Sequence, residues 1–104
     1  MDAKVQLVIV SSPENYAEEL AELLVREKLA ACVNILPGVQ SVYRWQGTIE
    51  KDSESLLLIK CTTAKYPLLE TRVKEVHPYE LPEIVTVSEL GGLEGYLEWV
   101  RNPG

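Results

Sequence analysis

The chain has few of the residues that would define a catalytic centre or a covalently stapled fold. It contains one histidine and two cysteines in 104 residues, and Cys32 and Cys61 form no CxxC pair. The sequence contains no P-loop, no GxGxxG and no closed zinc motif, and its residues do not follow a Ser-His-Asp order. We therefore expect a protein that is not an enzyme and that is held together by its hydrophobic core.

Positive charge is also scarce. The chain carries 10 basic and 16 acidic residues, which gives a net charge of −6. This excess of negative charge opposes binding to phosphate backbones and to anionic lipid, so we expect neither nucleic acid nor a membrane as partner. The apolar run near the N-terminus spans about six residues, too few for a secretory signal or a membrane span. These features favour a cytoplasmic protein with reduced thiols.

Hydrophobic residues make up 46% of the chain, and its length suits one domain spanning residues 1–104. Short β-branched runs indicate strands, and apolar residues spaced three and four apart indicate helices. The expected elements are a strand over 5–10, a helix over 13–29, a strand over 31–45 with a bulge or turn at Pro37-Gly38 and an extension over 47–50, a return strand over 56–61, a helix from about 63 to 77, an extended linker over 77–83, a strand over 84–88 and a helix over 93–101. This order predicts an α+β, ferredoxin-like β-α-β-β-α-β sandwich with a short C-terminal helix.

The second and third strands should form a long hairpin. We place its turn at the polar residues 51–54, so that paired residues have numbers summing to about 105. Trp45 then lies opposite Lys60, and Cys61 lies opposite Arg44. This pairing separates Cys61 from Cys32 along the ribbon and predicts no disulfide.

The two most continuously apolar strands, the first and the third, should occupy the centre of the sheet. Right-handed crossovers would place both long helices on one face of that sheet. The other face would then expose every second residue of two apolar strands, which is unusual in a soluble monomer. We therefore expect a homo-oligomer in which sheet faces or edges meet.

Four segments, spread over the whole chain and in order, carry a family resemblance. They are Ala31-Cys32-Val33-Asn34, Tyr43-Arg44-Trp45-Gln46-Gly47, His77-Pro78-Tyr79-Glu80-Leu81-Pro82-Glu83 and Tyr96-Leu97-Glu98-Trp99. With them the chain resembles the CutA family, named for divalent-cation tolerance. The resemblance implies a tight homotrimer, a role in copper and divalent-cation tolerance, no required cofactor, and an architectural likeness to PII signalling proteins.

The same resemblance suggests His77 and Cys32 as ligands of copper or another divalent cation. Family members implicated in copper binding carry a second histidine just before this one and a cysteine near the end of the first strand. Here these positions hold Val76 and, approximately, Val10 or Ser11. From the residues alone, a lone histidine at a helix end and a strand cysteine are more often structural.

Seven residues of the matching segments and their partners are candidates for a cleft between subunits. They are Asn34, Tyr43, Trp45, Glu50, Lys60, Tyr79 and Glu83. In one interpretation the aromatic rings only stabilise the hairpin and the subunit contacts. In the other, Lys60 faces a small anionic effector, and Glu50 or Glu83 faces a cation, as in a PII-like regulatory module.

Overall fold

The computed structural model describes residues 3–88 and 90–104. Its elements, in order, are β1 (Val5–Ser12), α1 (Ala17–Arg26), β2 (Cys32–Trp45), β3 (Thr48–Thr62), α2 (Tyr66–Val76), β4 (Ile84–Val87) and α3 (Glu94–Arg101). The predicted order of strands and helices is confirmed, and most boundaries move by a few residues. The largest difference is in β3, which starts at Thr48 instead of residue 56. α1 is shorter than predicted at both ends, because residues 14–16 and 27–28 form turns rather than helix.

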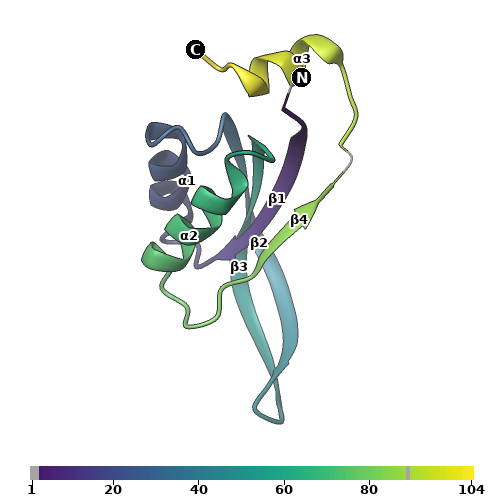
Figure 1. Ribbon diagram of the computed structural model, residues 1–104. Helices are drawn as coiled ribbons and strands as arrows, with labels where there is room; N and C mark the ends of the chain where they lie inside the picture. Colours follow the sequence, from purple (N-terminus) through teal and green to yellow (C-terminus); the bar gives the residue numbers. More distant parts are fainter. Residues whose placement is uncertain (1–2, 89) are drawn as a thin grey trace.

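One antiparallel sheet with the strand order β2-β3-β1-β4 organises the molecule. The prediction that the first and third strands are central is therefore confirmed. Figure 1 shows α1 and α2 together on one face of the sheet, while the β2–β3 hairpin projects beyond them, away from α3. This projection makes the chain elongated, with extents of 47 × 24 × 23 Å.

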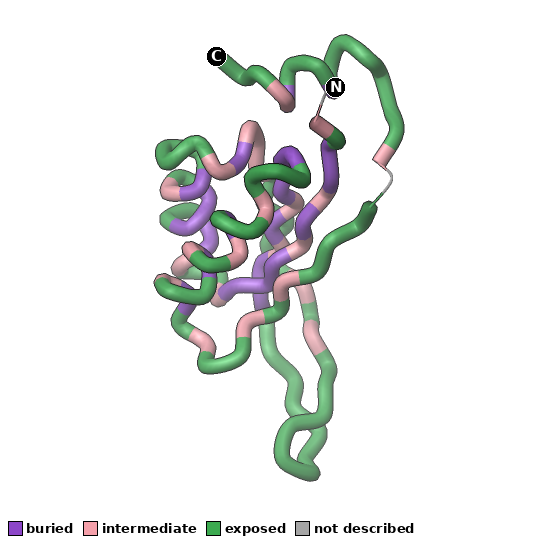
Figure 2. The backbone as a smooth tube through the Cα atoms, in the orientation of Figure 1, coloured by how far each residue is buried: buried purple, intermediate pink, exposed green. Residues whose placement is uncertain are grey.

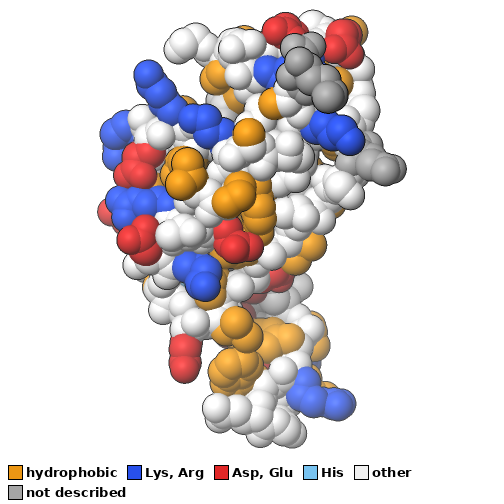
Figure 3. Space-filling model, viewed as in Figure 1, with side chains coloured by type: hydrophobic (Ala, Val, Ile, Leu, Met, Phe, Trp, Pro, Cys, Tyr) orange, Lys and Arg blue, Asp and Glu red, His pale blue; other side chains and the backbone are white. Residues whose placement is uncertain are grey.

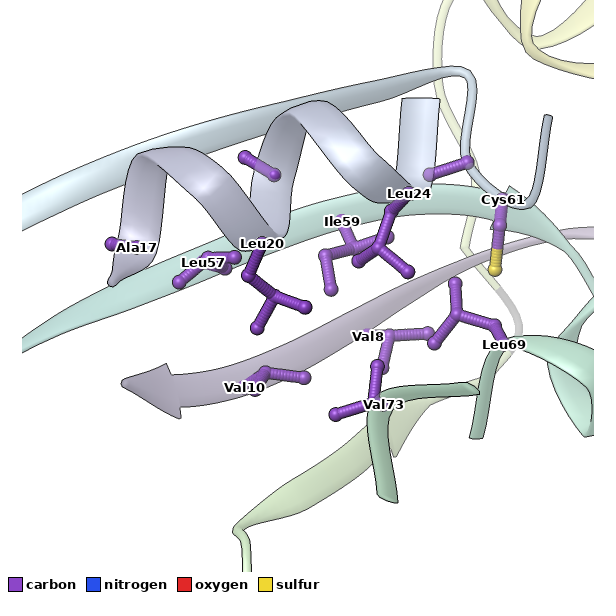
Figure 4. Close-up of a cluster of buried hydrophobic side chains, with 12 residues drawn as sticks. Val8, Val10, Ala17, Leu20, Leu24, Leu57, Ile59, Cys61, Leu69 and Val73 are labelled. Carbon is purple, nitrogen blue, oxygen red and sulfur yellow. The ribbon is translucent and has the colours of Figure 1, made fainter. Parts of the chain in front are cut away.

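The main core lies between the central strands and the two long helices (Figure 4). Its fully buried side chains are Val8 and Val10 of β1, Leu57 and Ile59 of β3, Leu20 and Leu24 of α1, and Leu69 and Val73 of α2. These side chains are aliphatic and come from alternate strand positions and from helix positions three or four apart, which is the pattern that predicted the elements.

The opposite face of the sheet, here called the open face, has little cover from the chain itself. α3 packs Leu97 and Val100 against Val5 at one end of it. Beyond that contact, apolar residues of all four strands on this face are half-buried or exposed: Leu7, Ile9, Leu36, Leu56, Leu58, Val85 and Val87. The expectation of an uncovered apolar sheet face is confirmed.

The predicted hairpin pairing is wrong. The strands reverse at Gln46 and Gly47, so that Trp45 pairs with Thr48 and Tyr43 with Glu50. Both turn residues have positive φ, 50° and 82°, the backbone of a two-residue turn that matches the twist of the two strands. Residues 51–54 continue β3: residues 51–53 lie on an exposed ribbon, where their polar side chains face water, and Glu54 is buried at its base (Figure 2).

The corrected register also changes the reason why the cysteines are unpaired. Cys32 pairs with Lys60, so Cys61 lies one position along β3 from Cys32's partner instead of opposite Arg44. Successive strand residues point to opposite faces, so Cys61 enters the core under the helices and Cys32 lies on the open face. Both thiols are free, and burial raises the pKa of Cys61 to about 11.

A β-bulge at Pro37-Gly38, one of the two predicted possibilities there, decides which residues of β2 reach the open face. Between Leu36 and Val39, β2 advances three residues while β3 advances two. The extra residue reverses the alternation, so the odd-numbered residues from Val39 to Trp45 lie on the open face. Gly38 has a φ of 70°, and its N–H donates a 2.6 Å hydrogen bond to Glu14 Oε1.

No helix within residues 3–88 and 90–104 has the length and apolar character needed to cross a membrane.

Two adjacent leucines of α2 test the assignment of the core. Leu69 is fully buried and Leu68 is 62% exposed. We expect Leu69→Ala to lower the free energy of unfolding by about 2–5 kcal/mol, because it leaves a cavity between helix and sheet. The matched change Leu68→Ala should cost about 0.5 kcal/mol. Guanidinium denaturation at one protein concentration measures both, and equal losses would contradict the packing.

Candidate functional site

A cleft with a volume of about 690 Å³ opens where the β2–β3 hairpin meets the segment after α2. The bulge and the turn of the hairpin bring aromatic and acidic side chains to this side. The hairpin residues that line the cleft are Ser41, Val42, Tyr43, Trp45, Asp52 and Glu54, and those of the segment are Pro78, Tyr79, Glu80, Leu81 and Glu83, with Ser11 from β1. Figure 3 shows hydrophobic side chains gathered on the hairpin beyond the helices.

Tyr79 and Glu54 join the two sides of the cleft. The Tyr79 hydroxyl donates a 2.7 Å hydrogen bond to Glu54 Oε2, and Glu54 is only 6% exposed. Burial and this carboxylate both raise the pKa of Tyr79, so the hydroxyl keeps its proton well above neutral pH. The contact fixes segment 78–83 against the base of the hairpin.

Tyr43 and Asp52 form a second pair farther along the ribbon. The Tyr43 hydroxyl donates to Asp52 Oδ2, and this hydrogen bond is the main cause that raises the pKa of Tyr43 to about 12. Asp52 and Glu54 are two residues apart on β3, so their side chains share the open face. The two tyrosines therefore hold the two carboxylates in fixed places in the wall of the cleft.

His77 lies behind the cleft with both ring nitrogens occupied. The Tyr79 N–H lies 3.1 Å from Nδ1, which must accept, so the proton belongs on Nε2. Nε2–H then donates to the Ser11 carbonyl oxygen at 2.7 Å. His77 is 7% exposed and is the C-cap residue of α2, where its backbone N–H donates to the Val73 carbonyl oxygen. In this arrangement neither nitrogen offers a free lone pair to a metal ion.

The structure does not bring the two predicted metal ligands together. Cys32 is the first residue of β2 and lies beside Tyr96 of α3. Burial and this cysteine both raise the pKa of Tyr96. His77 contacts Ser11 near the other end of β1. Within residues 3–88 and 90–104, no three His, Cys, Asp or Glu side chains are grouped so that they could hold a metal ion.

Four of the seven predicted cleft residues line this cleft: Tyr43, Trp45, Tyr79 and Glu83. The other three lie outside its lining. Lys60 donates to Asn34 Oδ1 and, at 3.2 Å, to the Leu58 carbonyl oxygen, on the apolar part of the open face. The predicted cross-strand contact between Lys60 and Trp45 is wrong, because the register places these residues far apart along the hairpin.

Glu50 is the third predicted residue that lies outside the cleft lining, and it pairs with Tyr43 near the hairpin tip. The analysis of the sequence missed Asp52 and Glu54 as lining residues, because it placed both in the turn. The Gln46-Gly47 dipeptide between two β-rich runs could have located the true turn and, with it, both carboxylates.

Comparison with known proteins identifies the family. The model of the family described as CutA1 divalent ion tolerance protein matches residues 6–103. The chain belongs to the CutA1 family. It is 50% identical over 97 residues to the divalent-cation tolerance protein CutA of Thermus thermophilus, and the match covers 92% of this chain and 94% of that protein. The family and this relative are named for ion tolerance rather than for a reaction.

Solved CutA structures share the whole fold. One from Nostoc sp., described as a PII-like protein in apo form, has a TM-score of 0.86 at 37% identity and covers 91% of this chain and 92% of its own. Another, from Archaeoglobus fulgidus, is described as periplasmic and has a TM-score of 0.88 at 33% identity over 92% and 94% of the two chains. The chain spans about half the length of the plant and human CutA proteins it also matches.

The tyrosines of this CutA chain give a test by pH. All five have a pKa raised above the usual 10, mainly by burial and, for Tyr43, by its hydrogen bond to Asp52. A pKa raised by folding adds stability that is complete below pH 10 and disappears as the pH rises through the folded value, for Tyr43 between pH 10 and about 12. At pH 10 we expect less tyrosinate absorbance near 295 nm in the folded protein than in guanidinium, where about half of each tyrosine is ionised. Coincident titration curves would contradict the burial and the hydrogen bonds of these tyrosines.

Proposed function

We propose that the protein is a non-enzymatic CutA homotrimer that binds divalent cations weakly, and that the cleft between the hairpin and segment 78–83 is the binding site. One observation carries the proposal. Four carboxyl side chains line the cleft, from Asp52, Glu54, Glu80 and Glu83, and its described lining includes no lysine, arginine or histidine. Such a lining attracts cations and repels anions.

The arrangement of the carboxylates supports weak rather than tight binding. A tight metal site needs several ligands that converge on one point, and no such group of three is found in the described residues. Mg²⁺ and similar hard cations keep several waters and bind through one or two carboxylates. Oxygen ligands favour these ions over Cu⁺, which prefers thiolate and imidazole, so we place copper second among the candidate ions.

The open face and the sheet edges support assembly. Apolar residues of all four strands remain uncovered on the open face, and a face of this kind is normally covered by a partner. Both edge strands, β2 and β4, are unpaired on their outer sides within the described sheet. Contacts between different edges of successive copies form a ring when the rotation between copies closes, and a closed ring of three agrees with the trimer that the family resemblance implies.

A PII-like regulatory module is the alternative function, and the PII-like description of the Nostoc relative supports it. The proposed anion contact, Lys60, lies outside the cleft and is hydrogen-bonded to Asn34. The acidic lining therefore makes a small anionic effector the second choice at this site. Two free cysteines fit the cytoplasm as the compartment, and the net charge of −6 fits a protein without a nucleic acid or membrane partner.

A pair of charge-matched variants tests the proposal. Glu80→Gln with Glu83→Gln removes two carboxylates from the cleft, and Glu18→Gln with Glu22→Gln removes two from the exposed side of α1. We expect isothermal titration with Mn²⁺ to show saturable binding that weakens at least tenfold in the cleft variant, because two charges about 5 Å from a divalent ion contribute roughly 3 kcal/mol in water before screening by salt. The α1 variant should bind like the parent protein.

Mass in solution is measured on the same samples. We expect a particle of about three times the 11.7 kDa chain. A monomer would overturn the proposed trimer. Equal weakening in both variants would show general surface charge in place of a binding site.

A further inference from the structure

The cleft has an aromatic side as well as an acidic one. Tyr43 and Trp45 come from the end of β2, and Tyr79 comes from the facing segment. Trp45 is 44% exposed although it lies on the same face as the apolar centre of the sheet. The faces of aromatic rings carry negative potential, and they attract cations that are only weakly hydrated.

The cleft has room for more than a metal ion. Its volume of about 690 Å³ lies in the range of sites that enclose small organic molecules, about 300–1,000 Å³. A metal ion fills a small fraction of this space and gains nothing from Leu81, Pro78 or the aromatic rings. An organic ligand would bury apolar surface against the same side chains.

The carboxylates also suit an organic cation. Asp52 and Glu54 are each hydrogen-bonded to a different tyrosine, Tyr43 and Tyr79. The described residues contain no group of three ligands around one point for a metal ion, but each carboxylate can accept a hydrogen bond from an N–H group. An ammonium group therefore requires only what the cleft provides: negative charge, single acceptors and ring faces.

From these features we infer that the ligand of the cleft is a small organic ammonium ion, held by its charge to the carboxylates and by its carbon atoms to the aromatic side. The inference rests on the proposed function, since it takes the cleft as the cation site and names the class of cation. It differs from metal binding in one testable respect: the aromatic rings are required for the ammonium ion and not for the metal.

Two tryptophans of nearly equal exposure provide a matched pair of variants. Trp45 lines the cleft, and Trp99, 42% exposed, lies on α3 at the other end of the molecule (Figure 1). The assembled protein is titrated with spermidine, tetramethylammonium, Mn²⁺ and succinate in phosphate buffer, since Tris is itself an ammonium ion. We expect saturable binding of both ammonium probes and none of succinate.

Trp45→Leu should weaken binding of the ammonium probes about three- to tenfold, the range expected for loss of a cation–π contact, and should leave Mn²⁺ affinity within about twofold. Trp99→Leu should change neither. Trp45→Phe, which keeps an aromatic ring, should retain most of the affinity, and circular dichroism confirms that each variant is folded.

The outcomes separate the two proposals. Mn²⁺ binding without ammonium binding overturns this inference and leaves the proposed function in place. Binding of neither cation overturns both. Ammonium binding that Trp45→Leu leaves unchanged also overturns the inference, because the aromatic side would then take no part.

Discussion

The single extra residue at the Pro37-Gly38 bulge is the constraint on which the functional side of this molecule depends. Strand side chains alternate between faces with a period of two, so one inserted residue exchanges the faces of everything that follows it. Without it, Tyr43 and Trp45 would point to the face of the helices, and Asp52 would have no tyrosine beside it. The positive φ of Gly38 and its hydrogen bond to Glu14 hold the bulge in place. Glu14, just before α1, thus helps to set the geometry of a cleft built from other elements.

The parts of the fold that follow from local chemistry could be predicted from the sequence. β1 and β3 contain continuous apolar runs and proved central, and the spacing of Leu20, Leu24, Leu69 and Val73 indicated two helices over one core. The hairpin register failed because polarity was taken as a sign of a turn. Residues 51–53 are polar because this part of the strand is exposed, and the buried Glu54 is hydrogen-bonded to Tyr79, whereas the turn is defined by backbone conformation at Gln46 and Gly47. A run of polar residues indicates a segment in contact with water. It does not by itself indicate that the chain reverses there.

The candidate site could be predicted only in part, for a related reason. Tyr43, Trp45, Tyr79 and Glu83 stand in recognisable motifs, but Asp52 and Glu54 become partners of the tyrosines only through the correct register. The state of His77 depends on a contact with Ser11, which is 66 residues away in the sequence. No pattern near a lone histidine shows whether its second nitrogen meets a carbonyl oxygen or remains available. Such contacts are properties of the folded chain.

The open face changes character along its length, and this change links assembly to ligand binding. Where the helices cover the other side of the sheet, the open face is apolar and suited to contact with other copies. Along the projecting hairpin the open face becomes aromatic and acidic. No described helix lies against the projecting part of the hairpin (Figure 1), and a two-stranded ribbon is marginally stable when it stands alone in water. Tyr79 ties its base to segment 78–83, and His77 ties the start of that segment to the end of β1. Whatever covers the rest, whether a ligand in the cleft or a neighbouring copy, stabilises the ribbon by binding its folded form. If the proposed ligand and the proposed neighbouring copy both cover this hairpin, occupancy of the cleft and association of the chains are coupled through its order.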